Sequence, residues 1–203
     1  VADGIFQNQT EVNAHTDEYG TVIQPNAQPG DIRFKDLNHD GKLDDNDKTF
    51  IGNAFPDLMV GINARLAWKN IDFAANFYGT IGNDVYNTTK GRYSGVSGEN
   101  VYAGTYNASW HGEGTSYDLP RLSYNDANQN WTRVSSFYVE DGSYLRCKQL
   151  QIGYTLPKKW TKKISLRLSF SAQNPFTITG YSGMDPEAAA LGTEGKVTES
   201  GID

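Results

Sequence analysis

The chain has 203 residues, a net charge of −6 and no lysine- or arginine-rich run, so nucleic acid is not an expected partner. Its single cysteine, Cys147, excludes an internal disulfide and a cysteine zinc cluster, and no apolar stretch approaches the roughly 18 residues of a membrane helix. The 21 glycines, 12 tyrosines and 9 phenylalanines favour β-strands joined by many turns.

The first distinctive element is an acidic segment at residues 36–47, which has the residue spacing of an EF-hand-type calcium loop. Oxygen-bearing side chains occupy loop positions 1, 3, 5, 9 and 12, and Gly41 at position 6 permits the sharp turn that such loops need. A hard divalent cation takes about six to eight oxygen ligands. The expected ligands of a structural Ca²⁺ ion are Asp36, Asn38, Asp40, the backbone carbonyl of Lys42, Asp44 and Asp47.

Two features separate this loop from paired-helix calcium sensors. Position 12 is Asp47 instead of the usual bidentate glutamate, which resembles the loops of dockerin modules. The preceding residues 30–35 alternate like a strand, so the expected role of the ion is structural. An acidic solvated turn is the alternative interpretation, because Asp, Asn and Gly are common in turns for local reasons. A dockerin-like adaptor would need a second loop and a helical period, and the sequence shows neither.

Residues 57–82 are predicted to form a β-hairpin with two long strands. Apolar and polar side chains alternate through 58–68 and again through 71–81, on either side of a tight turn. A second hairpin is predicted at 144–173, where the alternation runs through 149–156 and 164–173. Strands with one apolar face suit a soluble sandwich, in which that face meets another sheet, or an outer-membrane barrel, in which it meets lipid.

Strand length and side-chain distribution favour the barrel. The predicted strands are longer than the five or six residues usual in globular proteins and match the roughly nine to eleven that a membrane strand needs. Trp68 and Trp160 lie at strand ends, where aromatic girdles occur, although core packing at the end of a sandwich is the alternative for them. The links within hairpins are short and those outside them are long, which predicts extracellular loops at 13–56, 83–143 and 174–203.

The long loop at 83–143 is rich in Tyr, Asn, Gly and Ser and contains Trp110 and Trp131. Exposed aromatic side chains beside amides and hydroxyls suit contact with a substrate or a partner protein. The alternative is that both tryptophans form the small core of an ordered loop. No paired carboxylates or other catalytic arrangement can be identified, so no catalytic residue and no enzymatic activity are expected.

Several segments in collinear order resemble the C-terminal part of the SusC/RagA family of TonB-dependent outer-membrane transporters. The resemblance covers nearly the whole chain and rests on residues 4–7 (GIFQ), 29–36 (PGDIRFKD), 51–53 (IGN) with Pro56, 82–87 (GNDVYN), 139–146 (VEDGSYLR), 150–157 (LQIGYTLP), 174–177 (NPFT) and 181–187 (YSGMDPE).

This resemblance implies an all-β fold in which residues 1–203 form antiparallel strands of a large transmembrane β-barrel with long extracellular loops. It also implies uptake of oligosaccharides or peptides at the bacterial cell outer membrane, with a SusD-like surface lipoprotein as partner. Energy would come from TonB through N-terminal parts that the sequence does not contain. Four or so strands cannot close a barrel, so the chain is expected to be a piece of a larger protein in contact with outer-membrane lipid. The alternative is a secreted, calcium-stabilised β-sandwich that binds glycans.

Overall fold

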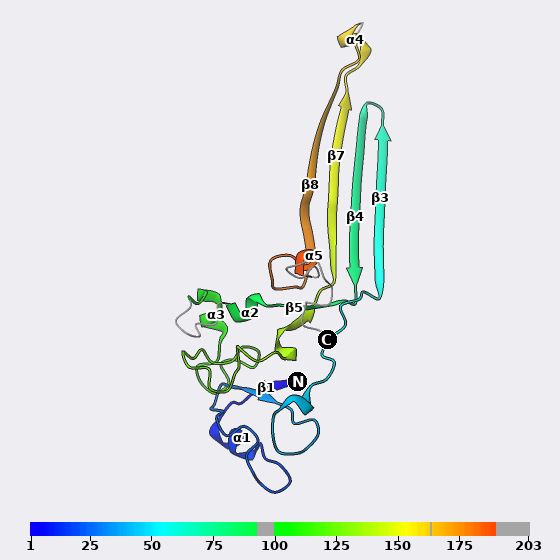
Figure 1. Cartoon of the computed structure of the whole chain (residues 1–203). Helices are drawn as coiled ribbons and strands as arrows, with labels where there is room; N and C mark the ends of the chain where they lie inside the picture. Colours follow the sequence, from blue (N-terminus) through cyan, green and yellow to red (C-terminus); the bar gives the residue numbers. More distant parts are fainter. Residues whose placement is uncertain (93–99, 163, 190–203) are drawn as a thin grey trace. The chain divides into compact units, whose positions relative to one another are not determined.

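The computed structural model describes residues 1–92, 100–162 and 164–189, which form two compact units (Figure 1). The first unit contains Val1–Gly52 and Tyr86–Val139, and the second contains Asn53–Val85 and the described residues from Glu140 onward. Among the described residues, no helix is both long and apolar enough to cross a membrane.

The second unit is built on one antiparallel sheet with the strand order β3-β4-β7-β8, and Figure 1 shows the four long strands side by side. This arrangement confirms the predicted all-β antiparallel fold class, and the tight turn at Lys69-Asn70 joins β3 to β4 as expected. The elements of this unit are β3 (Leu58–Trp68), β4 (Ile71–Ile81), β7 (Tyr144–Thr155), α4 (Lys158–Thr161), β8 (Arg167–Thr179) and α5 (Pro186–Ala189).

Strand register gathers the apolar side chains on one face of this sheet. Ile62 pairs with Phe77 and Leu66 pairs with Phe73, while the intervening position pairs two alanines. The same face continues across the other strands, because Phe73 pairs with Ile152 and Ile152 pairs with Phe170. Most of these large side chains are exposed, and they include Leu58, Ile62, Leu66, Trp68, Ile71, Ile81, Ile152, Leu168, Phe170, Phe176 and Ile178. The sheet therefore presents a continuous exposed apolar face.

A β-bulge in β7 preserves that face along the whole strand. Gln149 pairs with Asn76 and Cys147 pairs with Phe77, so Lys148 is an extra residue in the ladder. Apolar side chains consequently shift from even-numbered positions such as Leu150 to odd-numbered positions such as Cys147 without leaving the apolar face. A one-residue insertion without a bulge would have moved them to the opposite face.

The strand β8 differs from its prediction at both ends. It begins at Arg167 instead of residue 164 and continues to Thr179, so residues 174–179 are strand and not part of the predicted loop at 174–203. Asn174, with a positive φ of 47°, and Pro175 form an irregularity opposite the bulge of β7. The proline explains the wrong boundary, because proline inside a pattern normally argues against a strand unless it lies at an edge or a bulge.

The first unit has little regular structure and a small core of its own. Phe6, Val12 and Ala27 form its buried apolar cluster, and the ring of His15 packs edge-on against Phe6 at 5.6 Å between centroids. Its elements are β1 (Ala2–Ile5), α1 (Gln9–Ala14), β2 (Ile32–Phe34), η1 (Asp45–Asp47), α2 (Thr89–Arg92), α3 (Ala103–Ala108) and η3 (Ser136–Tyr138). Antiparallel pairing joins β1 to β2. Two further short strands, β5 (Asp84–Tyr86) and β6 (Val139–Asp141), pair with each other, and each has residues in both units.

Candidate functional site

The acidic loop begins directly after β2 and is closed by the carboxylates of its first and last residues. Asp36 accepts hydrogen bonds from the backbone N–H groups of His39, at 2.7 Å, and Gly41, at 2.8 Å. Asp47 accepts from the N–H groups of Leu37, at 2.7 Å, and Asp44, at 2.9 Å. Both side chains are buried within the loop. The backbone therefore wraps around two carboxylates that it also holds in place.

The loop holds the carboxylate of Asp47 in the ionised state. Burial alone would raise the pKa of Asp47, but hydrogen bonds from the backbone at Asp44, Leu37 and Asn38 outweigh it, so the pKa lies below its ordinary value. The carboxyl groups of Asp36 and Asp47 lie close to each other. Within the described residues, no Lys, Arg or His side chain lies within ion-pair distance of either carboxylate.

The other expected ligands lie on the outer part of the loop. Asn38 donates from its amide to Asp40 at 2.8 Å, and Asp40 accepts from the N–H of Lys42 at 2.9 Å. Asp44 forms a capping box with Asp47 at the start of η1. In the described part of the chain, no three His, Cys, Asp or Glu side chains are grouped closely enough to hold a metal ion. The structure thus brings Asp36 and Asp47 together and leaves the remaining expected ligands on the rim.

The chemistry of this donor set fits a hard cation. Every expected ligand offers oxygen, and two adjacent buried carboxylates without a cationic side chain favour a divalent ion such as Ca²⁺. Gly41, at φ 82°, and His39, at φ 60°, adopt left-handed backbone conformations that fold the loop tightly. Such a loop can stiffen the segment after β2.

A buried ion pair anchors the strand that leads into this loop. Asp31 is fully buried and accepts from Nε of Arg121 at 2.6 Å and from the amide of Asn130 at 2.8 Å. It also accepts from the backbone N–H of Gln28 at 2.8 Å. The partners come from positions 90 and 99 residues away in the sequence, so the network ties Val1–Gly52 to Tyr86–Val139 within the first unit. The sequence analysis did not identify this network.

Side-chain amides pair with the backbone of β2. Gln24 accepts from the N–H of Phe34 at 2.7 Å and donates to the carbonyl of Ile32 at 3.0 Å. Asn130 accepts from the N–H of Ile32 at 2.8 Å, and Asn128 donates to the same carbonyl at 2.9 Å. These contacts replace the second neighbouring strand that β2 lacks in the described structure, so the backbone polar groups remain satisfied.

Trp110 and Trp131 are both part of the first unit's interior packing. Trp131 is buried, and its ring meets Phe137 edge-on at 5.6 Å between centroids, while Tyr138 donates to the carbonyl of Trp131 at 2.6 Å. Burial raises the pKa of Tyr138. Trp110 is half-buried over Gly30, where a Cβ atom would lie 2.3 Å from the indole. The structure favours the interpretation that both rings form the core of the loop.

A cationic cluster lies on the polar face of the second unit's sheet, at the bulge of β7. Arg146 contacts Asp185 at 2.5 Å and Glu187 at 2.6 Å, and Lys148 contacts Glu187 at 2.7 Å. The segment that includes α5 is therefore fastened to this face by ion pairs. The alternation pattern did not reveal this contact, because Asp185 and Glu187 lie beyond the predicted second hairpin.

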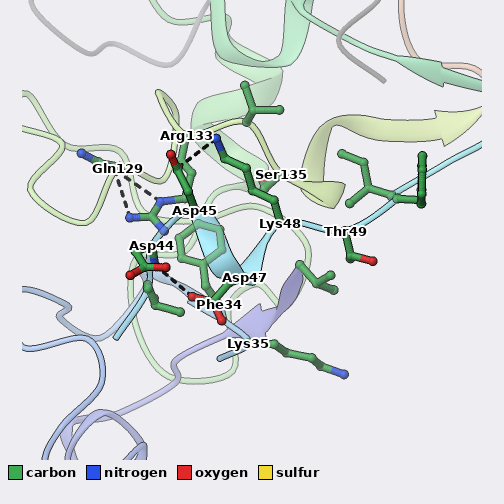
Figure 2. Close-up of a pocket in the computed structure, with 15 residues that line it drawn as sticks. Phe34, Lys35, Asp44, Asp45, Asp47, Lys48, Thr49, Gln129, Arg133 and Ser135 are labelled. Carbon is green, nitrogen blue, oxygen red and sulfur yellow. Dashed lines mark hydrogen bonds and ion pairs between the residues drawn. The ribbon is translucent and has the colours of Figure 1, made fainter. Parts of the chain in front are cut away.

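Beside the acidic loop, the first unit contains a cavity of about 310 Å³ (Figure 2). Figure 2 shows Asp44, Asp45 and Asp47 of the loop on its wall together with Lys48, Arg133 and Ser135. The Asp45–Lys48 ion pair measures 2.9 Å, and Gln129 accepts from the Arg133 guanidinium at 3.1 Å and 3.3 Å. The mixture of apolar and charged groups that line this cavity is typical of small-ligand sites.

Comparison with curated proteins identifies a consistent group of relatives, although no family model matches the chain. TonB-dependent receptor P3 of Formosa agariphila is 37% identical over 82% of this chain and 16% of its own length. TonB-dependent receptor SusC of Bacteroides thetaiotaomicron is 26% identical over 89% of this chain and 18% of its own length. The chain spans between 16% and 19% of the length of the four curated relatives it matches.

Solved structures support the same assignment at the level of the fold. A structure of the RagAB peptide importer in the closed-closed state aligns with 92% of this chain and 20% of the matched chain, with a TM-score of 0.57 and 20% identity. A structure of the RagAB peptide transporter aligns with 66% of this chain and 15% of the matched chain, with a TM-score of 0.54 and 24% identity. TonB-dependent receptors are outer-membrane β-barrel proteins. Over most of its length the chain is similar to TonB-dependent receptors, SusC among them, which confirms the resemblance identified from sequence.

Proposed function

We propose that the chain is part of an outer-membrane transporter that imports oligosaccharides or peptides. The observation that carries this proposal is the exposed apolar face shared by β3, β4, β7 and β8. These strands have 11 to 13 residues, which is enough to cross the hydrocarbon core of a bilayer. Exposing so large an apolar surface to water would be unfavourable, whereas contact with lipid tails is favourable.

The proposed topology follows from the lengths of the connections. The β3–β4 turn and the β7–β8 link are short, so they would face the periplasm, and the segments 13–56, 83–143 and the part of 174–203 beyond β8 would be extracellular. A SusD-like surface lipoprotein would close over this side, as the names of the SusC and RagAB relatives suggest. TonB would supply energy through parts of the receptor outside this chain.

Localisation and energy coupling test the transport proposal in the organism that makes the receptor. The intact receptor is expected in outer-membrane fractions, and its deletion is expected to abolish uptake of one class of oligosaccharide or peptide. Deletion of TonB should abolish the same uptake while receptor abundance is unchanged. A receptor that is recovered without detergent in soluble fractions would refute transport and favour a secreted calcium-stabilised β-sandwich that binds glycans.

We also propose that the loop at 36–47 holds one Ca²⁺ ion as a structural element. Asp36 and Asp47 would supply the buried carboxylates, while Asn38, Asp40, the carbonyl of Lys42, and Asp44 would complete the oxygen shell. When bound, the ion supplies positive charge between carboxylates that otherwise repel each other. The role is therefore scaffolding of an extracellular segment, where calcium sites with dissociation constants of about 10⁻⁴–10⁻³ M are useful.

Removal of calcium is expected to loosen the loop in the intact receptor. At a calcium concentration about 100 times the dissociation constant, binding contributes about 2.7 kcal/mol, and chelation removes this contribution. Hydrogen exchange of the backbone at 32–47, measured with calcium and with chelator, reports the change. Asp40→Ala should abolish the response to chelator.

The matched control for this experiment is Asp45→Ala. Asp40 and Asp45 are both exposed aspartates of the same loop, but only Asp40 is among the proposed ligands. Asp45→Ala should therefore keep the full response to chelator. Equal exchange rates with and without calcium in the unmodified receptor would contradict the calcium proposal.

A further inference from the structure

The cavity beside the acidic loop has the size of a small-molecule site. Its volume is about 310 Å³, and ligand pockets begin at about 300 Å³. Phe34, Leu43, Ile51 and Val134 supply apolar lining. Figure 2 shows charged side chains, among them Asp45, Lys48 and Arg133, around Phe34. All of the lining residues belong to the first unit.

Arg133 is positioned in this cavity without a carboxylate partner among the described residues. Its guanidinium lies over the ring of Phe34, 5.1 Å from the centroid, and donates from Nε and Nη2 to the amide oxygen of Gln129. Gln129 itself has a positive φ of 58°, an uncommon conformation for this residue type. A guanidinium has five N–H donors, so donors remain for a further acceptor.

The acidic residues on the wall are already occupied by other contacts. Asp45 pairs with Lys48, and Asp47 accepts from two backbone N–H groups. Asp44 accepts from the N–H of Asn46 at 2.7 Å. Lys35, the remaining cation of the wall, pairs with Asp3 at 3.2 Å. Arg133 is therefore the cationic side chain of the wall that has no carboxylate partner within the described structure.

A second cavity of about 190 Å³ shares Phe34, Leu43, Gln129 and Arg133 with the first. The guanidinium therefore borders both spaces. A ligand group bound to Arg133 has room on either side, so the site can accept one end or one branch of a longer molecule.

We propose that this cavity binds a carboxylate on a body of about amino-acid or monosaccharide size, with Arg133 as the group that contacts the carboxylate. A planar guanidinium recognises a carboxylate through two parallel hydrogen bonds, which is stronger than recognition of a neutral group. The shared chemistry fits both the free end of a peptide and a uronic acid residue of a glycan. This site is distinct from the cation loop and does not depend on the transport proposal.

Calorimetric titration of the intact, calcium-saturated receptor tests the site with defined probes. N-acetyl-leucine represents a peptide end and glucuronate represents a uronic acid, while N-acetyl-leucinamide and glucose are the matched neutral controls. At least one carboxylate should bind more than about tenfold more tightly than its neutral control. Arg133→Gln should weaken that binding by at least about tenfold.

Two further variants keep the test decisive. Arg33→Gln removes an arginine that pairs with Asp3 outside the cavity and should leave binding unchanged. Val134→Trp fills the cavity from an exposed wall position and should abolish binding even if Arg133→Gln fails to fold. Preference for N-acetyl-leucine identifies the peptide source and preference for glucuronate the glycan source. Absence of binding by both carboxylates, or binding that Arg133→Gln and Val134→Trp leave unchanged, overturns the proposal.

Discussion

Replacing Ile62 with arginine is expected to destabilise the membrane-inserted receptor by about 2–4 kcal/mol, the cost of placing arginine on the lipid face near the bilayer midplane. Ile62 lies near the middle of β3, and its side chain is exposed on the apolar face of the sheet. An arginine there would bring a charge into contact with hydrocarbon. Urea-dependent unfolding of the intact receptor from lipid vesicles measures this change.

The matched control is Asn63→Arg, one residue further along the same strand. Asn63 pairs with Asn76 on the polar face, so an arginine there would face the side that carries Arg65 and Gln149. We expect a cost below about 1 kcal/mol for this variant, because a water-filled interior tolerates charge. Equal costs for both variants would contradict a lipid-facing role for the apolar side and favour burial of both faces in protein.

The sheet could be predicted from the sequence because its determinants are local. Alternation with a period of two shows directly which residues share a face, and β3 and β4 follow this period without interruption. The bulge at Lys148 and the irregularity at Asn174 break the simple period, so β7 was predicted in part and the end of β8 was wrong. Both features depend on pairing with a neighbouring strand, which a single-strand pattern does not encode.

The first unit was harder to predict, because its determinants are contacts between distant segments. The ligand spacing of the acidic loop is a local pattern, and the strand-like entry at 32–34 was predicted correctly. Asp31, in contrast, depends on Arg121 and Asn130, and nothing near Asp31 in the sequence indicates these partners. The cavity at Arg133 is equally non-local, since it requires Phe34 and the acidic loop to pack beside residues 129–135.

The interior position of Trp131 follows from the same non-local packing. A tryptophan in a loop rich in polar residues suggested a contact surface, but its indole N–H bonds to the carbonyl of Arg121 at 3.4 Å inside the unit. The two long segments therefore stabilise each other around Asp31. A network such as that of Asp31 with Arg121 and Asn130 positions side chains more precisely than an isolated loop does.

Replacing Arg121 with alanine is expected to destabilise the first unit by about 3–5 kcal/mol, which is the usual cost of leaving a buried charge unpaired. Asp31 is fully buried, and Arg121 is its cationic partner among the described residues. Hydrogen exchange at Ile32 and Phe34 in the intact receptor reports the local stability, because these N–H groups bond to Asn130 and Gln24 in the same network. Both amides should exchange much faster in the variant.

Two comparisons separate the buried charge from a general loss of side-chain contacts. Arg33→Ala removes an arginine whose pair with Asp3 is exposed, with 36% and 42% of the two side chains accessible, so the expected cost is below about 1 kcal/mol. Adding Asp31→Asn to Arg121→Ala removes the unpaired charge and should restore part of the lost protection from exchange. The effect of the double variant then differs from the sum of the two single effects, and this difference is the coupling free energy of the pair. Strictly additive effects would mean that Arg121 stabilises the unit through packing alone, and that the ion pair does not hold the two segments together.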